Sequence, residues 1–194
     1  MLAELLEGRY PRAMTLPDDT PVLIRPMVPD DGPALLQFFR GLPEEDRLYL
    51  NDDVTKEAVI QAWCRELNYD RVLPLLADVD GRIVADATLH QQPRGWMSHI
   101  GRVRVAVAPE YRRRGLAGVL VRELIEVAVD VGLAKLDAEF MVEQEAAMRL
   151  MEKLGFYRVA ILPQHVWDLR GETHDFVIMV HDIRPDAEYF EPAD

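Results

Sequence analysis

The sequence predicts a mixed α/β domain in which a mostly antiparallel sheet carries helices on both faces. One observation is the pair Asp80-Gly81 between two apolar runs, a strong signal for a two-residue hairpin. Another is that segments with helical periodicity alternate with strand-like segments before and after this hairpin. The predicted order is β-α-α-β-β-β-α-β-α-β-β, and 194 residues without an internal repeat suit one domain.

The first half begins with a strand at residues 22–25, followed by a helix that starts after Pro29 and ends before Pro43. A second helix is expected with Thr55 as its N-cap. The hairpin strands occupy residues 72–79 and 82–89, and the segment from 98 to 108 pairs as the next antiparallel strand.

In the second half, apolar residues recur at helical spacing through residues 116–131, and residues 134–142 alternate as a strand. A helix at 145–154 is closed by Gly155, and two last strands are expected at about 156–168 and 174–183. Residues 21–184 therefore form the domain. Residues 1–20 are expected to be a peripheral N-terminal arm, acting as a lid or a subunit contact, and 185–194 a polar tail.

Composition narrows the function classes. A net charge of -12 argues against a general nucleic-acid-binding protein, which needs an extended basic surface. Cys64 is the only cysteine, so no intrachain disulfide can form. The acidic N-terminus does not resemble a signal peptide, and no apolar run reaches membrane-spanning length. These features predict a cytoplasmic protein that does not bind membranes.

One stretch, at residues 105–118, is typical of a phosphate-binding turn. A β-branched strand ends before Pro109, and three arginines then precede the helix that contains Ala117. The free N–H groups of a helix N-terminus attract anions, and the small residues Gly115 and Ala117 leave the backbone accessible. The glycine patterns of the P-loop and of dinucleotide-binding folds are both absent. The turn therefore predicts a pyrophosphate site, with an arginine run at an ordinary helix start as the alternative.

The pattern Arg-x-x-Gly-x-Ala, formed by Arg112, Gly115 and Ala117 after Val-Ala-Val-Ala-Pro-Glu-Tyr, resembles the acetyl-CoA-binding motif of the GNAT N-acetyltransferase superfamily. The element order and the run Leu-Gly-Phe at 154–156 are also similar to this family. Residues 24–49 look like the branch that includes bacterial protein-lysine acetyltransferases.

The resemblance implies that acetyl-CoA lies in a cleft where the central strand and the next strand splay apart. The strand backbone would hold the pantetheine arm, the N–H groups of residues 113–118 would cradle the pyrophosphate, and Gln144 would hydrogen-bond the pantetheine. The implied cofactor-binding residues are Val105, Ala106, Val107, Arg112, Arg113, Arg114, Gly115, Leu116, Ala117, Gly118 and Gln144.

The catalytic positions depart from the family pattern. The family's glutamate base corresponds here to Gly101 or Arg102, and Met151 replaces the tyrosine that serves as general acid. His99 is the nearest substitute base, with Glu139 as a second candidate, although a lone histidine on a strand is more often structural. The other histidines lack metal-ligand spacing, so no metal is expected.

Together these features predict an N-acetyltransferase that moves an acetyl group from acetyl-CoA to a primary amine, of a small molecule or a protein lysine, by direct attack. The alternative is a catalytically impaired acyl-CoA-binding regulatory module. The acceptor is expected between residues 44–53 and 168–174. Acids in the first segment favour a cationic acceptor, whereas Arg102 and Arg104 would oppose one if they faced the cleft. The resemblance also implies a homodimer.

Overall fold

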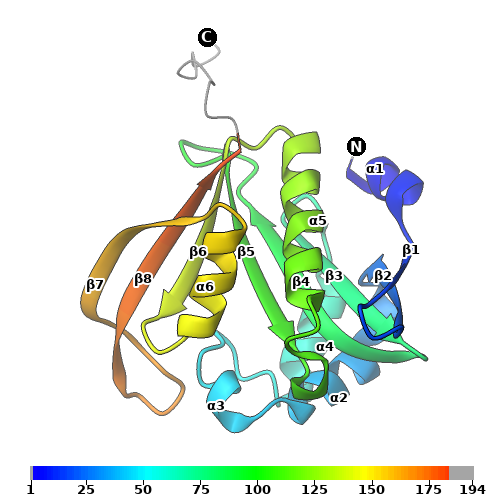
Figure 1. The fold of residues 1–194 in the computed structure, drawn as a ribbon, viewed down its shortest axis with the longest axis horizontal. Helices are drawn as coiled ribbons and strands as arrows, with labels where there is room; N and C mark the ends of the chain where they lie inside the picture. The colour runs from blue at the N-terminus through cyan, green and yellow to red at the C-terminus, as the bar shows by residue number, and fades with distance from the viewer. Residues whose placement is uncertain (1, 184–194) are drawn as a thin grey trace.

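An eight-stranded sheet forms the centre of the computed structural model, which describes residues 2–183 (Figure 1). The strand order is β1-β2-β3-β4-β5-β6-β8-β7, and every neighbouring pair is antiparallel except β5 and β6. This confirms the predicted mixed, mostly antiparallel sheet. The strands are β1 Arg12–Thr15, β2 Pro21–Pro26, β3 Val72–Val79, β4 Arg82–Gln91, β5 Ile100–Val107, β6 Lys135–Met141, β7 Tyr157–Trp167 and β8 Thr173–Asp182.

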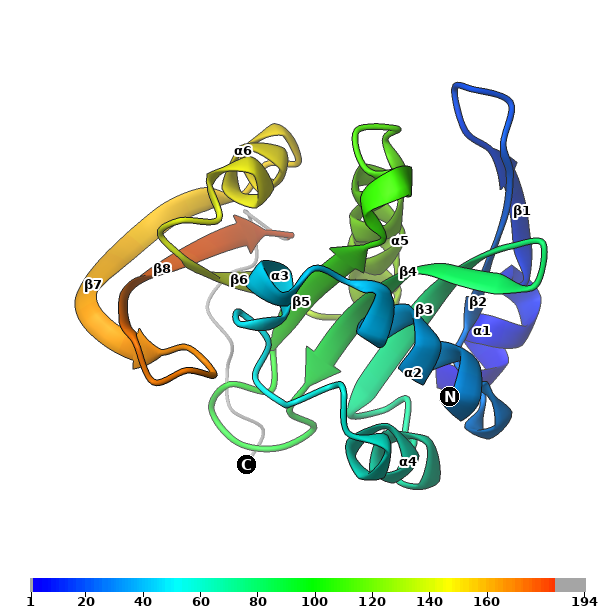
Figure 2. The ribbon, with the colours of Figure 1, turned by 90° about the horizontal axis from the view of Figure 1, so that it is seen from below.

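Helices cover both faces of the sheet, as expected. Figure 2 shows α5 and α6 on one face and α2 and α4 on the other. The helices are α1 Leu2–Arg9, α2 Gly32–Gly41, α3 Glu44–Arg47, α4 Glu57–Arg65, α5 Leu116–Asp130 and α6 Glu145–Lys153. No helix among residues 2–183 is long and apolar enough to cross a membrane.

The core consists of two layers of apolar side chains separated by the sheet. One layer contains the apolar face of α5, where Leu120, Leu124 and Val127 are fully buried against the strands. In the other, Phe39 of α2 and Ile60 of α4 pack over the opposite face. The two faces are therefore both covered, and the sheet strands are correspondingly apolar.

Strands β5 and β6 pair over only three residues. Ile100, Gly101 and Arg102 align with residues 135–137, and no pairing follows beyond Arg102. The strands then diverge, as Figure 2 shows. This confirms the predicted splay beside the strand that leads into the phosphate turn.

The N-terminal segment is part of the fold rather than peripheral, so this expectation was wrong. Strand β1 pairs with β2 over four residues and lengthens the sheet. Leu2, Leu6 and Leu16 are buried in the same core layer as α5. The segment joins the domain because its leucines remove apolar surface from water. The expected tail, 185–194, lies outside the described residues.

One local prediction also differs from the structure. Helix α4 begins at Glu57, and Thr55 does not cap it, because the Thr55 hydroxyl donates a hydrogen bond to Asp53 at 2.6 Å. The acidic segment at residues 44–53 contains the short helix α3, Glu44–Arg47. Asp46 of this helix forms an ion pair with Arg112 at 2.5 Å. The segment is thereby fixed against the phosphate turn.

Candidate functional site

The turn after β5 exposes a set of backbone N–H groups. Gly115 is the N-cap of α5 and has φ +84°, a left-handed conformation that favours glycine. The N–H groups of residues 115–118 have no acceptor within residues 2–183. A Cβ added to Gly115 would meet no atom within 4 Å. The backbone is therefore accessible and provides donors that an anion can bind.

The three arginines of the turn differ in their contacts. Arg112 donates through Nε to the Val107 carbonyl at 2.9 Å and also pairs with Asp46. Arg114 pairs with Asp18 at 2.8 Å. Arg113 adopts φ +58°. Thus two of the guanidinium groups hold the turn against the strand end and the β1–β2 loop, a role that the sequence did not indicate.

The remaining predicted cofactor residues border the splay. Val105, Ala106 and Val107 lie on β5 beyond its pairing with β6. Gln144 precedes α6, where its Oε1 accepts the Met141 N–H at 2.9 Å. Near the start of α5, Gly118 approaches α6, since a Cβ there would lie 3.5 Å from Leu150. The phosphate turn and α6 therefore lie close together, as a shared cofactor site requires.

On the other face of the sheet, a pocket of about 660 Å³ lies beneath α2 and α4. Polar side chains of β4 and β5 line its sheet side, and apolar side chains line its helix side. Val105 and Ala106 border it as well, so the pocket meets the β5 segment that also borders the splay. The lining of these strands includes Asp86, Thr88, His90, Arg102 and Arg104, the acids Asp52 and Glu66 also border the pocket, and the apolar residues include Met27, Leu35, Phe39, Trp63 and Leu67.

Asp86 is a pocket residue that the sequence reasoning missed. It lies directly opposite Ala106 across the β4–β5 ladder. Its Oδ1 atom is shielded from solvent and has no hydrogen-bond partner among residues 2–183. Burial raises the pKa of this carboxyl to about 7. The available signal was a single acid inside a hairpin strand, 83–89, whose other residues are apolar except Thr88.

Arg102 and Arg104 both line the pocket, and Glu139 lies between them. The Glu139 carboxylate is 2.8 Å from Nη2 of Arg102 and 3.9 Å from Nη2 of Arg104. The Asn51 amide, with its oxygen toward Arg104, accepts hydrogen bonds from both terminal nitrogens at 3.0 and 2.6 Å. Glu139, predicted as a base, is therefore engaged by two cations. In the described part of the chain, Nε of Arg102 is buried without a hydrogen-bond partner.

His99 directly precedes β5, at the opposite end of that strand from the phosphate turn. Its carbonyl accepts the Ala134 N–H at 2.8 Å. The structure does not bring it together with Asp86 or Gln144. Of the two positions that could match the family's glutamate, only Arg102 faces the pocket, because a Cβ on Gly101 would lie 2.7 Å from Leu133 in the core. Met151 is buried at 1% exposure.

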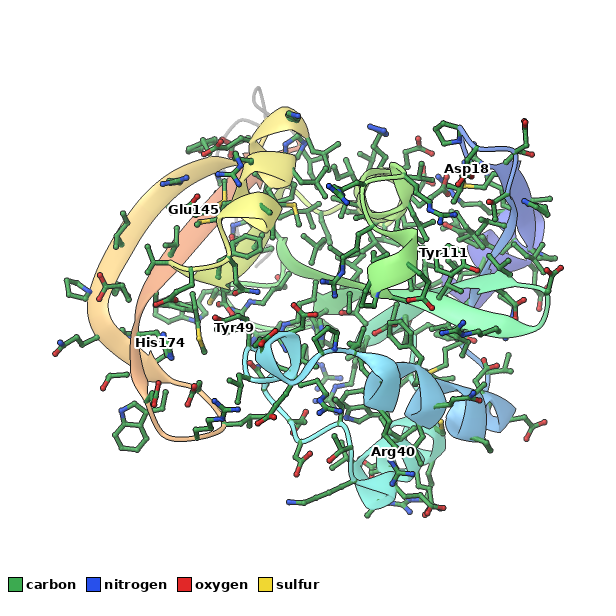
Figure 3. All side chains as sticks on the ribbon, turned by 60° about the horizontal axis from the view of Figure 1, so that its bottom comes forward. Asp18, Arg40, Tyr49, Tyr111, Glu145 and His174 are labelled. Atoms are coloured by element: carbon green, nitrogen blue, oxygen red, sulfur yellow. The ribbon has the colours of Figure 1, made fainter. Side chains whose placement is uncertain are left out.

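A second polar cluster surrounds His174 near the β7–β8 connection. Tyr49 and His174 lie next to each other, with ring centroids 6.2 Å apart (Figure 3). His174 Nδ1 is 3.0 Å from Glu143, and this hydrogen bond raises the pKa of the imidazole. Ligand atoms of Asp168, Glu172 and His174 come within 4.8 Å of one another. Asp168 already accepts the N–H groups of residues 170 and 172, so it stabilises the turn.

Taken together, the splayed sheet, the donor-rich turn and the adjoining pocket define a transferase that binds an acyl-coenzyme A. A family model described as "Acetyltransferase (GNAT) family" matches residues 36–156. The chain belongs to this family, whose cosubstrate is acetyl-CoA. The unpaired N–H groups and the open space at Gly115 fit a pyrophosphate.

Curated relatives are similar at moderate identity. An acetyltransferase of Yersinia pestis (strain Pestoides F) is 29% identical over 160 residues, covering 75% of this chain and 99% of the relative. The L-amino acid N-acetyltransferase AaaT of Escherichia coli (strain K12) is 29% identical over 83 residues. That match covers 42% of this chain and 51% of AaaT, so this chain spans about half of the length of that relative.

Solved structures share the fold. YncA, a putative acetyltransferase from Salmonella typhimurium solved with its cofactor acetyl-CoA, superposes with a TM-score of 0.73 at 20% identity, covering 89% of this chain and 98% of that one. The GNAT domain of S. lividans PAT gives a TM-score of 0.74 at 17% identity, covering 88% and 96%. Both likenesses concern the fold alone.

Proposed function

We propose that the protein transfers the acetyl group of acetyl-CoA to a primary amine held in the pocket beneath α2 and α4. The observation that carries this proposal is that Val105 and Ala106 border both the pocket and the splay. A cofactor lying along β5 and an acceptor in the pocket would then meet at one stretch of backbone. Such placement of two reactants accounts for much of the rate of a direct transfer.

The chain's own groups divide the work as follows. The N–H groups of residues 115–118 bind the pyrophosphate, and Gln144 contacts the pantetheine arm. Acetyl-CoA supplies the activated acyl group. In direct attack the amine nitrogen forms a bond to the carbonyl carbon, the carbon–sulfur bond breaks, and the sulfur leaves as a thiolate. The amine must lose a proton before or during this step.

Asp86 is the best-placed group to accept that proton. It lies opposite Ala106, and its raised pKa of about 7 suits a general base. His99 and Glu139 stay predictions from the sequence. Neither is as well supported, since His99 is at the far end of β5 and Glu139 is paired with arginine. A buried Met151 leaves the thiolate without the family's acid.

The catalytically impaired regulatory module is the second candidate, and two observations favour it. Arg102 faces the pocket where the family pattern has a glutamate, and Met151 cannot donate a proton. Binding of acetyl-CoA without turnover would establish this alternative. A cytoplasmic location remains a prediction from the sequence, and a possible homodimer remains an expectation from the family resemblance alone.

Calorimetric titration with acetyl-CoA tests the cofactor site. Gly115→Asn keeps a residue that tolerates positive φ but places a side chain before the N-terminus of α5. Gly171→Asn is the matched control, because Gly171 also has φ +84° and open space around an added Cβ. We expect the parent and Gly171→Asn to bind and Gly115→Asn to bind at least about tenfold more weakly. Equal affinity in all three would contradict the assigned site.

Transfer is then measured as acetyl-CoA-dependent release of free thiol against a panel of primary amines. Turnover with any of them, lost in Asp86→Asn, supports the enzyme and the assigned base. Tight binding of acetyl-CoA with no turnover against the whole panel supports the regulatory module instead.

A further inference from the structure

The segment that follows α3 crosses the splay between β5 and β6. The Tyr49 ring contacts the imidazole of His174 edge to face, with ring centroids 6.2 Å apart (Figure 3). His174 lies in the first residues of β8, close to where that strand begins to pair with the end of β6. The Asn51 amide, with its oxygen toward Arg104, accepts hydrogen bonds from that β5 side chain. Residues 49–51 therefore reach from the β6–β8 side of the splay to β5.

The same opening contains the assigned contacts of the pantetheine arm. His174 Nδ1 lies 3.0 Å from Glu143, which directly precedes the assigned residue Gln144. On the other side, Arg104 directly precedes the β5 backbone that is assigned to the same arm. Both contacts of the segment are therefore next to assigned cofactor contacts, and Tyr49 lies beside the path of the arm.

The Tyr49 hydroxyl is available to a ligand. Three other tyrosines, at positions 10, 69 and 157, each donate a hydrogen bond to a carboxylate or a carbonyl. Within residues 2–183 the Tyr49 hydroxyl has no such partner, and the ring contact with His174 is the interaction that holds the side chain. The residue is partly buried, and residues 50–52, which follow it, line the acceptor pocket. Tyr49 therefore lies where the pocket adjoins the splay.

The surroundings of Tyr49 keep its hydroxyl protonated. Burial raises the pKa of this phenol, and so do four carboxylates, which are, in order of effect, Glu143, Asp168, Asp46 and Glu45. Three of these carboxylates already have partners of their own, namely a histidine, two backbone N–H groups and an arginine. At neutral pH the hydroxyl is therefore a hydrogen-bond donor that keeps its proton.

The leaving sulfur of the proposed transfer needs such a donor. When the carbon–sulfur bond breaks, its electron pair goes to sulfur, and negative charge develops there. Met151 occupies the position of the family's tyrosine, and it is buried and cannot donate a hydrogen bond. A donor that is held in advance at a developing charge lowers the barrier, because it needs no reorganisation during the reaction. A second tyrosine beside the cofactor path can supply that donor.

We propose that Tyr49 donates a hydrogen bond to the sulfur of the cofactor and stabilises the thiolate as coenzyme A leaves. The amine nitrogen forms its bond to the carbonyl carbon, and the proton of the amine goes to Asp86. Asp86 then returns this proton to water, the released thiolate takes one from water, and Tyr49 keeps its own. This inference rests on the proposed acetyl transfer, and it adds a catalytic residue to the same site.

The first test measures the pKa of the thiol in bound coenzyme A and needs no amine acceptor. Thiolate absorbance in the ultraviolet is followed across pH, as the difference between samples of the full chain with and without coenzyme A. Tyr49→Phe keeps the ring against His174 and removes the hydroxyl. Because hydrogen bonds to charged groups are strong, the thiol pKa should be at least about one unit higher in Tyr49→Phe than in the parent.

The second test is kinetic and uses any amine that the parent acetylates. Tyr49→Phe should lower kcat by at least about tenfold, whereas KM for the amine and the calorimetric Kd for acetyl-CoA stay within about threefold of the parent. Tyr157→Phe is the matched control in both tests, because Tyr157 lies opposite Val180, at the other end of β8 from His174. Thermal unfolding checks that both variants are folded.

A lower kcat with an unchanged thiol pKa would mean that Tyr49 acts through the shape of its segment, and it would overturn this inference. Unchanged values in both tests would overturn it as well and leave the proposed acetyl transfer standing. Binding of acetyl-CoA by the parent without turnover of any amine would contradict the transfer itself. The thiol titration would then decide alone whether Tyr49 contacts the sulfur.

Discussion

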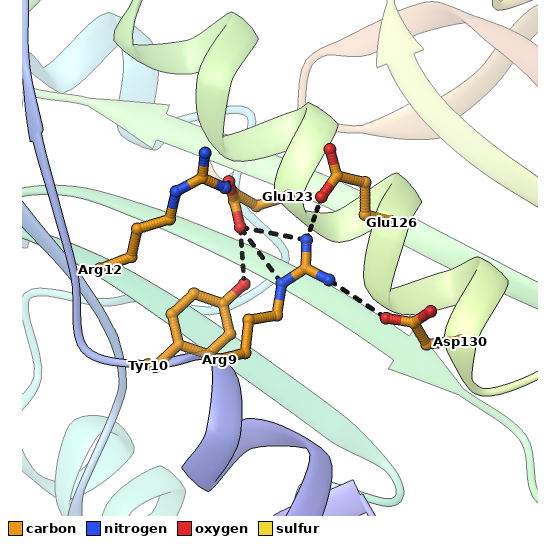
Figure 4. A network of polar contacts seen from close by, with 6 residues as sticks. All are labelled: Arg9, Tyr10, Arg12, Glu123, Glu126 and Asp130. Carbon is orange, nitrogen blue, oxygen red and sulfur yellow. Dashed lines mark hydrogen bonds and ion pairs between the residues drawn. The ribbon is translucent and has the colours of Figure 1, made fainter.

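Tyr10 donates its hydroxyl hydrogen to the carboxylate of Glu123 at 3.1 Å, which links the N-terminal segment to the middle of α5 (Figure 4). Glu123 is only 3% exposed, and the guanidinium groups of Arg9 and Arg12 also contact it. A buried carboxylate is tolerated because these three donors compensate for its lost hydration. The first strand of the sheet is thereby anchored to the helix that begins at the phosphate turn.

Glu123→Gln should lower the free energy of unfolding by about 2 to 3 kcal/mol, because it removes charge-assisted bonds and leaves Arg9 and Arg12 without their shared partner. Chemical denaturation measures the loss. Glu126→Gln is the control: Glu126 also contacts Arg9, but its side chain is 58% exposed, and about 1 kcal/mol or less is expected. Similar losses in the two variants would mean that burial of Glu123 does not matter.

Ionisation of Asp86 should have opposite effects on stability and on activity as the pH rises. Its folded-state pKa of about 7 lies above its ordinary value of 3.8, so the folded state holds the proton more tightly. Stability should therefore fall as pH rises from about 4 to about 7, whereas kcat/KM should rise with a midpoint near pH 7 as the base ionises.

Asp86→Asn should flatten the stability profile in this window and lower kcat/KM by at least about 100-fold. Denaturation and initial rates across pH 5–9 check both effects. The exposed residue Asp70 provides the control variant Asp70→Asn, which should match the parent. A parent-like pH–rate profile in Asp86→Asn would exclude Asp86 as the base.

Removing the Arg112 side chain should weaken acetyl-CoA binding, because this side chain fixes the shape of the turn. Arg112→Ala removes both the bond to the Val107 carbonyl and the ion pair with Asp46. We expect acetyl-CoA to bind about tenfold more weakly by calorimetry, since the N–H groups are no longer held in place. Asp46→Asn loses only the half-exposed ion pair and should stay within about threefold of the parent. A larger effect for Asp46→Asn would assign the role to α3 instead.

Replacing Gly101 by alanine should produce a packing defect in the core. In Gly101→Ala the new methyl would lie 2.7, 2.8 and 2.9 Å from side-chain atoms of Leu133, Leu89 and Leu136. Overpacking of this kind should cost about 1 to 3 kcal/mol of unfolding free energy. Gly118→Ala is the control, because its methyl meets Leu150 at an ordinary 3.5 Å. Unchanged thermal unfolding of Gly101→Ala would show that the three leucines can move aside.

Much of the fold could be predicted from local patterns. Turn chemistry and apolar spacing, which act over a few residues, predict the hairpin at Asp80-Gly81 and the helices α5 and α6. The N-terminal segment could not, because the contacts that hold it to α5 come from residues more than a hundred positions away, such as Glu123.

The candidate site divides in the same way. The turn at 112–117 is a continuous stretch of sequence, so its motif alone was sufficient to propose it as the pyrophosphate site. The pocket is assembled from segments that are far apart in the sequence, and Asp86 gains its properties only from burial and from its position opposite Ala106 in the β4–β5 ladder. The sequence led to the expectation that Arg102 and Arg104 oppose a cationic acceptor if they face the cleft, but strand register alone decides whether they face it.

The three-residue pairing of β5 with β6 has a consequence for cooperativity. Strands β6, β7 and β8 with α6 form a block that is tied to the rest of the sheet by a narrow seam. Such a block can open as a separate unit at a lower free energy than global unfolding, so its amides should exchange with deuterium first. A molecule that contacts both β5 and β6 across the splay would stabilise the two parts of the sheet together. Its binding would then slow hydrogen exchange of backbone amides far from the cleft.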